Sequence, residues 1–387
     1  MKRVKLTIVY GLIMLSMFTG CGTQKSKENG KENQAGNIQS QSDAAKDDDI
    51  IQVSFPSEYK KNINNVLFSC SVLAPETPVL TVTKAKKMEI NRLELAEYLI
   101  QSRNVSKTTI WNEDGTDSIY DGKMDLSKDQ KSQQLEFVYW LEDGSLINVE
   151  KNGVLSFADS VQVTEALNLG EEDEGYNGDL YLQDRDFTFA TEKEVLDEFQ
   201  KIIHEYTDVE DTQPVVYCVD ADSLNKNRGV SEAEETGGSE TSFTHADDGY
   251  YICMRQQLQG IPVFPREKMF YTEYAGNAPI IGYYTINGWQ ELIVDGKMLY
   301  TFEVSDKPVK LKEFDEIAET VSEYYNAFIT ENTYEVYRAT LYNYVTEDGC
   351  VTPVWIFKIY EKYPDGNFRC DQLDINAVTG EVFTVYD

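Results

Sequence analysis

The chain has 387 residues and carries 67 aspartates and glutamates against 35 lysines and arginines, a formal net charge of −32 at pH 7. A field of this sign repels phosphate backbones and anionic lipid headgroups, so it argues against nucleic acid as a partner and favours cationic ligands, divalent ions or plain solubility. With 2 histidines and no Cys-X-X-Cys spacing, the composition also argues against a transition-metal site, and we expect no cofactor.

The N-terminus has the pattern of an export signal that ends in a lipid-attachment site. Three basic residues precede an apolar run at 6–18, which is too short for a lasting membrane span. The run continues into Phe-Thr-Gly-Cys at 18–21, which resembles a bacterial lipobox. That motif predicts cleavage between Gly20 and Cys21 and lipidation of Cys21. We therefore expect a protein held on the extracytoplasmic face of the cell membrane by a lipid anchor.

The segment after Cys21 contains almost no apolar residues, so it cannot bury enough surface to offset its chain entropy and is predicted to be disordered. The remainder is long for one compact core and suggests two or three domains. The predicted organisation is a signal peptide at 1–20, a polar linker at 21–50, an N-terminal α+β domain at 51–160, an acidic linker or loop at 161–190, one lobe at 191–305 and a C-terminal lobe at 306–387.

The N-terminal domain is expected to combine one helix with antiparallel strands. Alternating apolar residues predict a strand at 66–72, and apolar residues at helical spacing predict a helix at 90–102. A meander follows, in which Asp-Gly and Asn-Gly pairs provide the positive φ that tight hairpins need. Its three strands are predicted at 135–140, 146–149 and 154–157.

The second half of the chain shows one order of elements twice, a helix followed by antiparallel strands. Thr191 and Glu194 fit a capping box at the start of the first helix. Its strands are predicted at 215–219 and from 250 to 302, separated by a polar stretch at 222–248 that we expect to be a long loop. The second helix and its strands are predicted at 311–329, 334–345, 354–360 and 368–386. The expected fold class is α+β, with antiparallel sheets each packed by a helix and repeated helix-plus-meander lobes after the disordered linker.

Five cysteines remain after Cys21, and an odd number leaves at least one free thiol. If the segments around Cys218 and Cys253 pair antiparallel, these two could face each other; the alternative is that the thiols are buried singly as small apolar groups. The pairing stays open among Cys70, Cys218, Cys253, Cys350 and Cys370.

No motif for catalysis is complete. His204 and Glu205 begin the His-Glu-X-X-His pattern of zinc proteases, but Asp208 stands where the second histidine would be. Neither a serine-hydrolase elbow nor a phosphate-binding glycine loop occurs, so no catalytic residue is assigned. Weak calcium candidates lie in acidic loops whose spacing does not fit an EF-hand, and the alternative is that these are solvated acidic loops. These candidates are Asp220, Asp222, Asp247 and Asp248.

Aromatic residues are abundant, with 25 tyrosines and 4 tryptophans. Trp140 and Trp355 lie within strong strand patterns, so we expect both in the core. Trp289 directly follows the turn at 287–288 and is the candidate for contact with a ligand. Tyrosine is a strand former with a polar tip, so half-buried strands explain its abundance, and a sugar-stacking surface is the alternative.

The last strands resemble a known group of domains. Pro-Val-Trp-Ile-Phe at 353–357 and Asp-Ile-Asn-Ala-Val-Thr-Gly-Glu-Val at 374–382 resemble the closing strands of PepSY-type and YycH/YycI-like domains. Gly-Ile-Pro-Val-Phe at 260–264 resembles a strand of the same group and of protease propeptides. The resemblance covers residues 191–387 and, with the lipobox and linker, implies a Gram-positive bacterial lipoprotein. It also implies non-catalytic roles, such as modulating a sensor kinase or restraining a protease.

The expected function is non-catalytic: a lipid-anchored extracytoplasmic protein that acts through contacts with another protein of the cell envelope. The first alternative is a lipoprotein that binds a small molecule, namely a sugar, a peptide or a cation. The least favoured alternative is a hydrolase that works with a pair of carboxylates. Among 67 acidic residues many such pairs can be chosen, so their number is no evidence for this activity.

Overall fold

The structure is a computed structural model of the chain. It describes residues 53–100, 103–112, 115–124, 135–151, 153–157, 167, 181, 184–227, 242–265 and 278–383, which all belong to one compact unit, Ile50–Asp387. The predicted signal peptide, the linker and the expected lipid site at Gly20 and Cys21 lie outside these ranges. No helix within the ranges is long and apolar enough to cross a bilayer.

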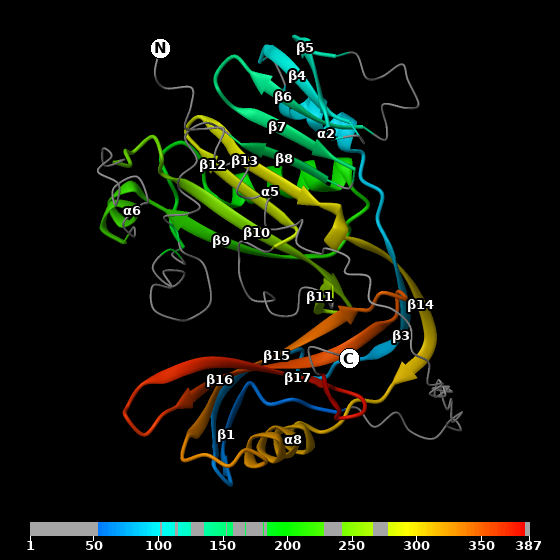
Figure 1. The fold of residues 1–387 in the computed structure, drawn as a ribbon, viewed down its shortest axis with the longest axis vertical. Helices are drawn as coiled ribbons and strands as arrows, with labels where there is room; N and C mark the ends of the chain where they lie inside the picture. Colours follow the sequence, from blue (N-terminus) through cyan, green and yellow to red (C-terminus); the bar gives the residue numbers. More distant parts are fainter. Residues whose placement is uncertain are drawn as a thin grey trace, which may run out of the picture. The chain divides into compact units, whose positions relative to one another are not determined.

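Sixteen of the described strands form one mixed sheet (Figure 1). Nine of them are joined by antiparallel pairings in the order β9 (Thr212–Val219), β10 (Gly249–Leu258), β12 (Ile280–Thr285), β13 (Gly288–Asp295), β8 (Gly153–Phe157), β7 (Leu146–Glu150), β6 (Glu136–Leu141), β4 (Val105–Trp111) and β5 (Asp117–Asp121). The predicted meander of the N-terminal domain is confirmed as β6, β7 and β8. Through the pairing of β8 with β13, it extends the sheet of the second half of the chain.

Two helices cover one face of this antiparallel part, α2 (Arg92–Ile100) and α5 (Glu192–Tyr206) (Figure 1). The predicted capping box is confirmed, because Thr191 accepts the backbone N–H of Glu194 while the Glu194 carboxylate accepts the N–H of Thr191. α5 buries one apolar stripe, and each side chain of this size contributes about 1.5–3 kcal/mol when fully buried. The stripe consists of Val195, Phe199, Ile202 and Ile203.

The other part of the sheet joins the two ends of the described chain. Its strands are β1 (Glu58–Ile63), β2 (Val66–Leu73), β15 (Thr333–Val345), β16 (Val351–Lys362), β17 (Phe368–Asn376) and β18 (Val382–Phe383). β15 pairs antiparallel with β16 but parallel with β2. Helix α8 (Phe314–Asn326) packs on one face of this part, where Trp355 is fully buried against Phe314 and Phe55.

Strand β11 (Ile261–Pro265) links the two parts, because it pairs antiparallel with β10 and parallel with β15. A separate two-stranded ribbon consists of β3 (Leu80–Lys87) and β14 (Tyr300–Val309), and a single 3₁₀ turn, η4 (Gly296–Met298), precedes β14. The buried amide of Gln256 holds the start of the ribbon, since it accepts the N–H of Tyr300 and donates to its carbonyl oxygen.

The polar stretch predicted as a loop at 222–248 is partly helical, and to that extent the prediction is wrong. Helix α6 (Ala221–Asn227) begins where Asp248 accepts the backbone N–H of Ala221, and the Asn225 amide exchanges two hydrogen bonds with the backbone of Phe243. These side-chain bonds to backbone groups 18 and 27 residues away fix a short helix that has too few apolar residues to show a periodic pattern. Residues 228–241 of the stretch lie outside the described ranges.

The described fold is rich in strands, with few helices, and its mixed sheet is compatible with the predicted α+β class. The strands of 51–160 are divided between the two parts of the sheet: β1 and β2 lie beside β15, whereas β4 to β8 continue from β13. The predicted domain boundaries at 160, 190 and 305 stay predictions.

The two cysteines that might have faced each other do not. β9 and β10 pair antiparallel as the argument required, but the register places Tyr250 opposite Cys218 and Val215 opposite Cys253. Cys218 points to the same face as its partner Tyr250, and Cys253, three residues after Tyr250 on β10, points to the opposite face. Cys218 therefore joins the core beneath α5, and Cys253 joins the core on the other face. All five described cysteines are free thiols.

Candidate functional site

The calcium candidates gather around α6, where most of them already accept protein hydrogen bonds. Asp220 accepts the backbone N–H and the hydroxyl of Ser223 at 2.9 and 3.0 Å and lies 3.3 Å from Arg185. Asp248 binds the first N–H of α6 at 2.8 Å and lies 3.1 Å from a ring nitrogen of His245.

The other two candidates make different contacts. Asp247 accepts the N–H and the hydroxyl of Thr244 at 2.8 and 3.2 Å, and Asp222 is exposed on the first turn of α6. Within the described ranges, no group of three or more histidine, cysteine or acidic side chains is placed to hold an ion. The arrangement is that of turns and a helix cap that use carboxylates as hydrogen-bond acceptors.

Trp289 is half-buried on β13 and packs against the helix-covered core. Its ring centroid lies 4.9 Å from that of Phe199 and 5.0 Å from that of Tyr284, and its indole N–H donates to Glu198 at 3.1 Å. A ligand at this position would have to compete with Glu198 for the indole N–H. Contact between Trp289 and a ligand stays a prediction.

The two tryptophans expected in the core differ. Trp355 is fully buried, as predicted, but Trp140 is partly exposed on the face of β6 that α2 does not cover. The pleat explains the difference, because Phe137, Tyr139 and Leu141 take the covered face and leave Trp140 on the other. There its indole N–H donates to Thr109 at 3.2 Å and the Lys107 ammonium lies 4.6 Å from its ring centroid.

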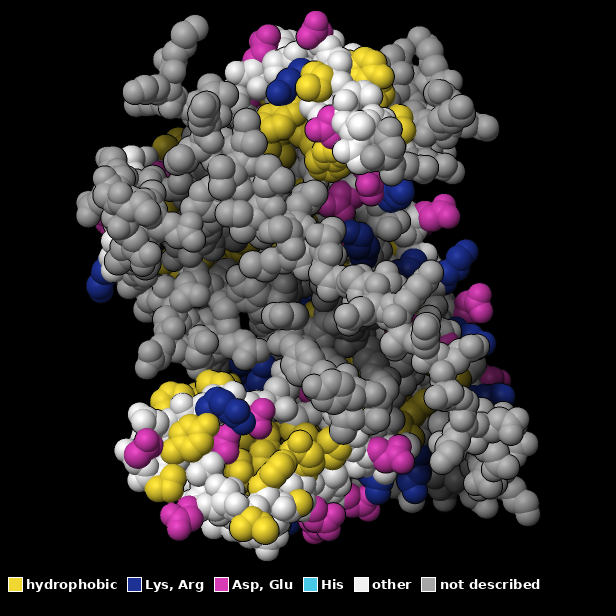
Figure 2. All heavy atoms as spheres, viewed as in Figure 1, with side chains coloured by type: hydrophobic (Ala, Val, Ile, Leu, Met, Phe, Trp, Pro, Cys, Tyr) yellow, Lys and Arg dark blue, Asp and Glu magenta, His cyan; other side chains and the backbone are white. Residues whose placement is uncertain are grey.

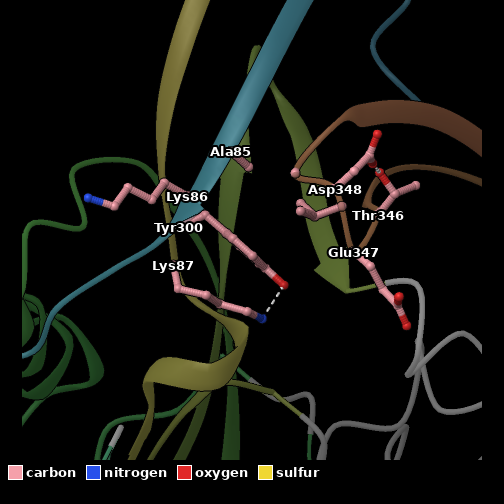
Figure 3. A pocket seen from close by; sticks show the side chains of 9 residues that line it. Ala85, Lys86, Lys87, Tyr300, Thr346, Glu347 and Asp348 are labelled. Atoms are coloured by element: carbon pink, nitrogen blue, oxygen red, sulfur yellow. Dashed lines mark hydrogen bonds between the residues drawn. The ribbon is translucent and has the colours of Figure 1, made fainter.

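A pocket of about 260 Å³ lies where the β3–β14 ribbon meets the turn between β15 and β16 (Figure 3). Lys86, Lys87 and Tyr300 line it from the ribbon, and the turn at 346–349 lines it from the other side. Figure 3 shows the side chains of Lys87 and Tyr300 reaching toward the turn, whereas Lys86 points the other way. The carboxylates of Glu347 and Asp348 extend away from Lys87 and Tyr300, so the charged groups that line the pocket do not face one another across it (Figure 3).

The turn is fixed to the ribbon by backbone contacts. The N–H of Ala85 donates to the carbonyl oxygen of Gly349 at 2.7 Å, and Lys84 forms an isolated bridge with Cys350. Gly349 has φ +77°, and a Cβ there would lie 2.5 Å from the Ala85 oxygen. Only glycine fits this position without strain, so the distance between the two walls of the pocket is set by the backbone.

A second feature is an exposed apolar cluster at the end of α8, here called the aromatic tip and consisting of Tyr324, Phe328 and Ile329. Phe328 is 49% exposed and Ile329 fully exposed, while the rings of Tyr324 and Phe328 pack 5.3 Å apart. Phe368, which is 54% exposed, begins β17 at the same end of the sheet. Figure 2 shows apolar side chains beside acidic ones over this part of the molecule. Adjacent exposed apolar residues of this size mark interaction surfaces more often than isolated ones do.

A hydrogen-bonded network supports the tip from beneath. Tyr325 packs 4.2 Å from Tyr334 and donates its hydroxyl to Asp371 at 2.9 Å. Burial, followed by the negative charge of Asp371, raises the pKa of Tyr325, so its hydroxyl stays protonated and keeps donating. Glu361 accepts from Asn332, in the loop after α8, at 2.7 Å and pairs with Arg369 at 2.8 Å.

Neither the pocket nor the tip is among the sites predicted from the sequence. The pocket combines residues from three separate segments, which no local pattern brings together. The tip does have a signal in the sequence: Phe328 and Ile329 belong to the predicted helix at 311–329, but the helix ends at Asn326 and leaves both residues outside its buried stripe.

Comparison with known proteins defines the fold alone. No protein-family model matches the chain, and no curated protein matches it. A crystal structure of a protein from Eubacterium rectale ATCC 33656, described as uncharacterized, is similar with a TM-score of 0.56 and 13% sequence identity. The match covers 85% of this chain and 94% of that chain. The described fold is therefore shared over most of both chains.

Proposed function

We propose that the protein is lipid-anchored through Cys21 on the extracytoplasmic face of the cell membrane and acts there without catalysis, by binding a partner protein of the envelope through the aromatic tip. The observation that carries the proposal is the exposure of Phe328 and Ile329 on a rigidly supported helix end. The order of α5 and α8, each followed by antiparallel strands, supports the PepSY- and YycI-like relation of residues 191–387, which belongs to the same proposal.

The charges around the tip define the chemistry of the partner. Glu323 and Glu331 flank the tip and are exposed, whereas the two nearby cations, Lys362 and Arg369, are each paired with a glutamate. The tip is thus an apolar centre with an acidic rim. Such a surface is complementary to a protein that presents apolar side chains ringed by lysine and arginine, and it opposes an anionic bilayer.

The test is capture from detergent-solubilised membranes of the producing cells, with the lipidated full chain as bait. A double variant, Phe328→Ser with Ile329→Ser, should reduce recovery of the partner at least about tenfold, the loss expected when one or two apolar anchors are removed. The matched control is Ile119→Ser with Tyr120→Ser on β5, an exposed apolar pair of similar size. This control should capture the partner as the wild type does.

A photoreactive side chain at position 328 then identifies the contact, which should fall on a partner segment rich in lysine or arginine. Several results would overturn the proposal. Equal loss from the tip variant and the β5 variant would show non-specific adsorption. A cross-link to a second copy of the chain, or flotation with neutral vesicles that depends on Phe328, would assign the tip to self-association or to the bilayer.

A further inference from the structure

We propose that strand β5 binds an extended peptide segment of the pattern basic–X–apolar–X–basic, which adds to the border of the sheet as one more strand. The basic residues of the segment lie opposite Asp117 and Asp121, and its apolar residue lies opposite Ile119. The inference does not depend on the aromatic tip. Its basis is an open strand edge whose exposed side chains define the chemistry of the segment that fits it.

β5 is an edge strand that lacks proline and lysine. Within the described part of the chain it pairs only with β4, at one border of the sheet (Figure 1). Proline and lysine are the residues that commonly keep a further strand away from an edge. Two other edges of this sheet carry them, since β9 contains Pro214 and β1 contains Lys60 and Lys61. The sequence of β5, Asp-Ser-Ile-Tyr-Asp, has neither, so its edge is open to pairing.

The outward backbone groups of this edge belong to every second residue of β5. Backbone hydrogen bonds close the pairing with β4 at its two ends, from the N–H of Asn112 to the oxygen of Thr116 and from the N–H of Gly122 to the oxygen of Ser106. Along an antiparallel ladder, hydrogen-bonded pairs alternate with pairs whose N–H and C=O groups point away from each other. On β5 the groups that point away from β4 are those of Asp117, Ile119 and Asp121. An extended peptide can bond to all of them.

The side chains of the same residues define the ligand. Because successive residues of a strand alternate between faces, Asp117, Ile119 and Asp121 share the face that α2 does not cover. Ile119 is 66% exposed, and both aspartates are exposed. Lys107, which lies opposite Asp121 on β4, places its ammonium over the Trp140 ring. An added strand therefore meets an acidic, an apolar and an acidic side chain in turn, and opposite charges or apolar pairs stabilise such cross-strand positions.

The two aspartates also oppose pairing between two copies of the chain. In an antiparallel pair of β5 strands centred on Ile119, Asp117 of one copy lies opposite Asp121 of the other. Like charges directly opposite each other are destabilising, whereas a basic segment gains two pairs of opposite charge. The edge thus selects a basic peptide against a second copy of itself.

The experiment measures the fluorescence anisotropy of a labelled peptide, Ser-Lys-Thr-Ile-Thr-Lys-Ser, with the full chain in non-ionic detergent micelles. We expect saturable binding with a dissociation constant below about 1 mM. N-methylation of the central isoleucine replaces the N–H that faces Ile119 and should weaken binding at least about tenfold, because it removes a hydrogen bond and keeps the strands apart. N-methylation of a neighbouring threonine alters an N–H that faces away from β5 and should change the affinity less than about threefold. Both methylated peptides carry the same charge, so general attraction to the acidic chain affects them equally.

Variants of the chain test the charges. Asp117→Asn with Asp121→Asn should weaken binding at least about threefold, as expected when two cross-strand pairs of opposite charge are lost. The matched control is Glu319→Gln with Glu323→Gln, which removes the same charge from the exposed face of α8 and should change the affinity less than about twofold.

Three results would overturn the inference. The first is no saturable binding up to about 3 mM peptide. The second is an equal effect of the two N-methyl groups, which would show that the peptide is not held as a strand. The third is an equal effect of the two charge variants, which would show attraction to the overall charge of the chain. The comparison of methylated peptides uses the unaltered chain, so it is decisive even where a variant fails to fold.

Failure of this inference is distinct from failure of the proposed function. The tip variant, Phe328→Ser with Ile329→Ser, should bind the peptide like the wild type. The β5 variant, Ile119→Ser with Tyr120→Ser, should bind the peptide at least about threefold more weakly and still capture the partner of the tip.

Discussion

Helices α5 and α8 look alike as sequence patterns, but their ends are used differently. Both are amphipathic, with 15 and 13 residues, and each buries an apolar stripe against antiparallel strands. The end of α5 is enclosed: Thr207 is 5% exposed, and the carbonyl oxygen of Tyr206 accepts the N–H of Asn91. The end of α8 instead leads into Phe328 and Ile329, which stay in solvent.

The difference shows that the buried stripe of a helix identifies its core face but not its role. Each stripe is a packing feature, and both helices would be needed for folding alone. Apolar residues that continue beyond the stripe and are not covered by another element say more about function. At α5, Asn91, the residue before α2, donates its N–H to the last residue of the helix, and the following Thr207 is buried. At α8, no described element covers the end of the helix in this way, which is why the partner surface is proposed there.

The largest expected effect is a difference in stability between a tryptophan removed from the core beneath α8 and one removed from the core beneath α5. Trp355→Ala should reduce the free energy of unfolding by about 3–5 kcal/mol, because the side chain is fully buried against Phe55 and Phe314 and leaves a large cavity. Trp289→Ala, on the α5 side, should cost only about 1–2 kcal/mol, since that ring is half-buried. Urea unfolding of both variants checks the comparison, and equal losses would contradict it.

Local elements were predictable because their signals lie within a few residues. The capping box at Thr191, the strand at 66–72, the meander and the buried Trp355 all follow from short-range pattern. The parallel pairing of β2 with β15 was not predictable, because it joins the two ends of the chain and its specificity lies in packing rather than in sequence spacing.

The candidate sites were less predictable than the fold. Trp140 was expected in the core because its strand pattern is strong, yet only every second residue of that strand faces α2. The pocket depends on Lys87, Tyr300 and Glu347, which are brought together by the contact between the ribbon and the turn. No local pattern contains that contact. The tip does have a local signal, because two neighbouring apolar residues follow the last turn of a helix at 328 and 329.

A smaller effect distinguishes how the two helices begin. Thr191→Ala should destabilise the protein by about 0.5–2 kcal/mol, because it removes the hydroxyl that accepts the N–H of Glu194 and leaves only the half of the capping box in which the Glu194 carboxylate accepts the N–H of residue 191. Glu313→Ala at the same position of α8 should change stability by less than about 0.5 kcal/mol, since Glu313 makes no side-chain cap hydrogen bond. Thermal or urea unfolding of the pair measures the difference. A larger loss from Glu313→Ala would show that α8 depends on its first turn more than α5 does.

The smallest effect is a matched pH dependence on the two sides of the molecule. Tyr250 lies under α5, where burial raises its pKa to about 12; Tyr59 lies beside α8, where burial and then its hydrogen bond to Asp315 raise its pKa to about 12. Each phenol ionises near pH 10 in the unfolded chain, so between pH 10 and 12 the folded state holds a proton that the unfolded state has lost. The stabilising contribution of each tyrosine is therefore complete below pH 10 and declines as the pH rises toward 12.

Tyr59→Phe and Tyr250→Phe should each make the fall in melting temperature between pH 10 and 12 shallower by a similar amount, because each removes one phenol that ionises more readily in the unfolded chain than in the folded one. The double variant should show the sum of the two changes, since the residues lie in separate core clusters and do not contact each other. The remaining tyrosines still titrate, so some alkaline destabilisation persists. If only Tyr250→Phe flattened the profile, the hydrogen bond between Tyr59 and Asp315 would not hold the phenol proton in solution. The hydrogen bond from Tyr59 on β1 to Asp315 on α8 would then be weaker than the one from Tyr250 on β10 to the carbonyl oxygen of Ala190, just before α5.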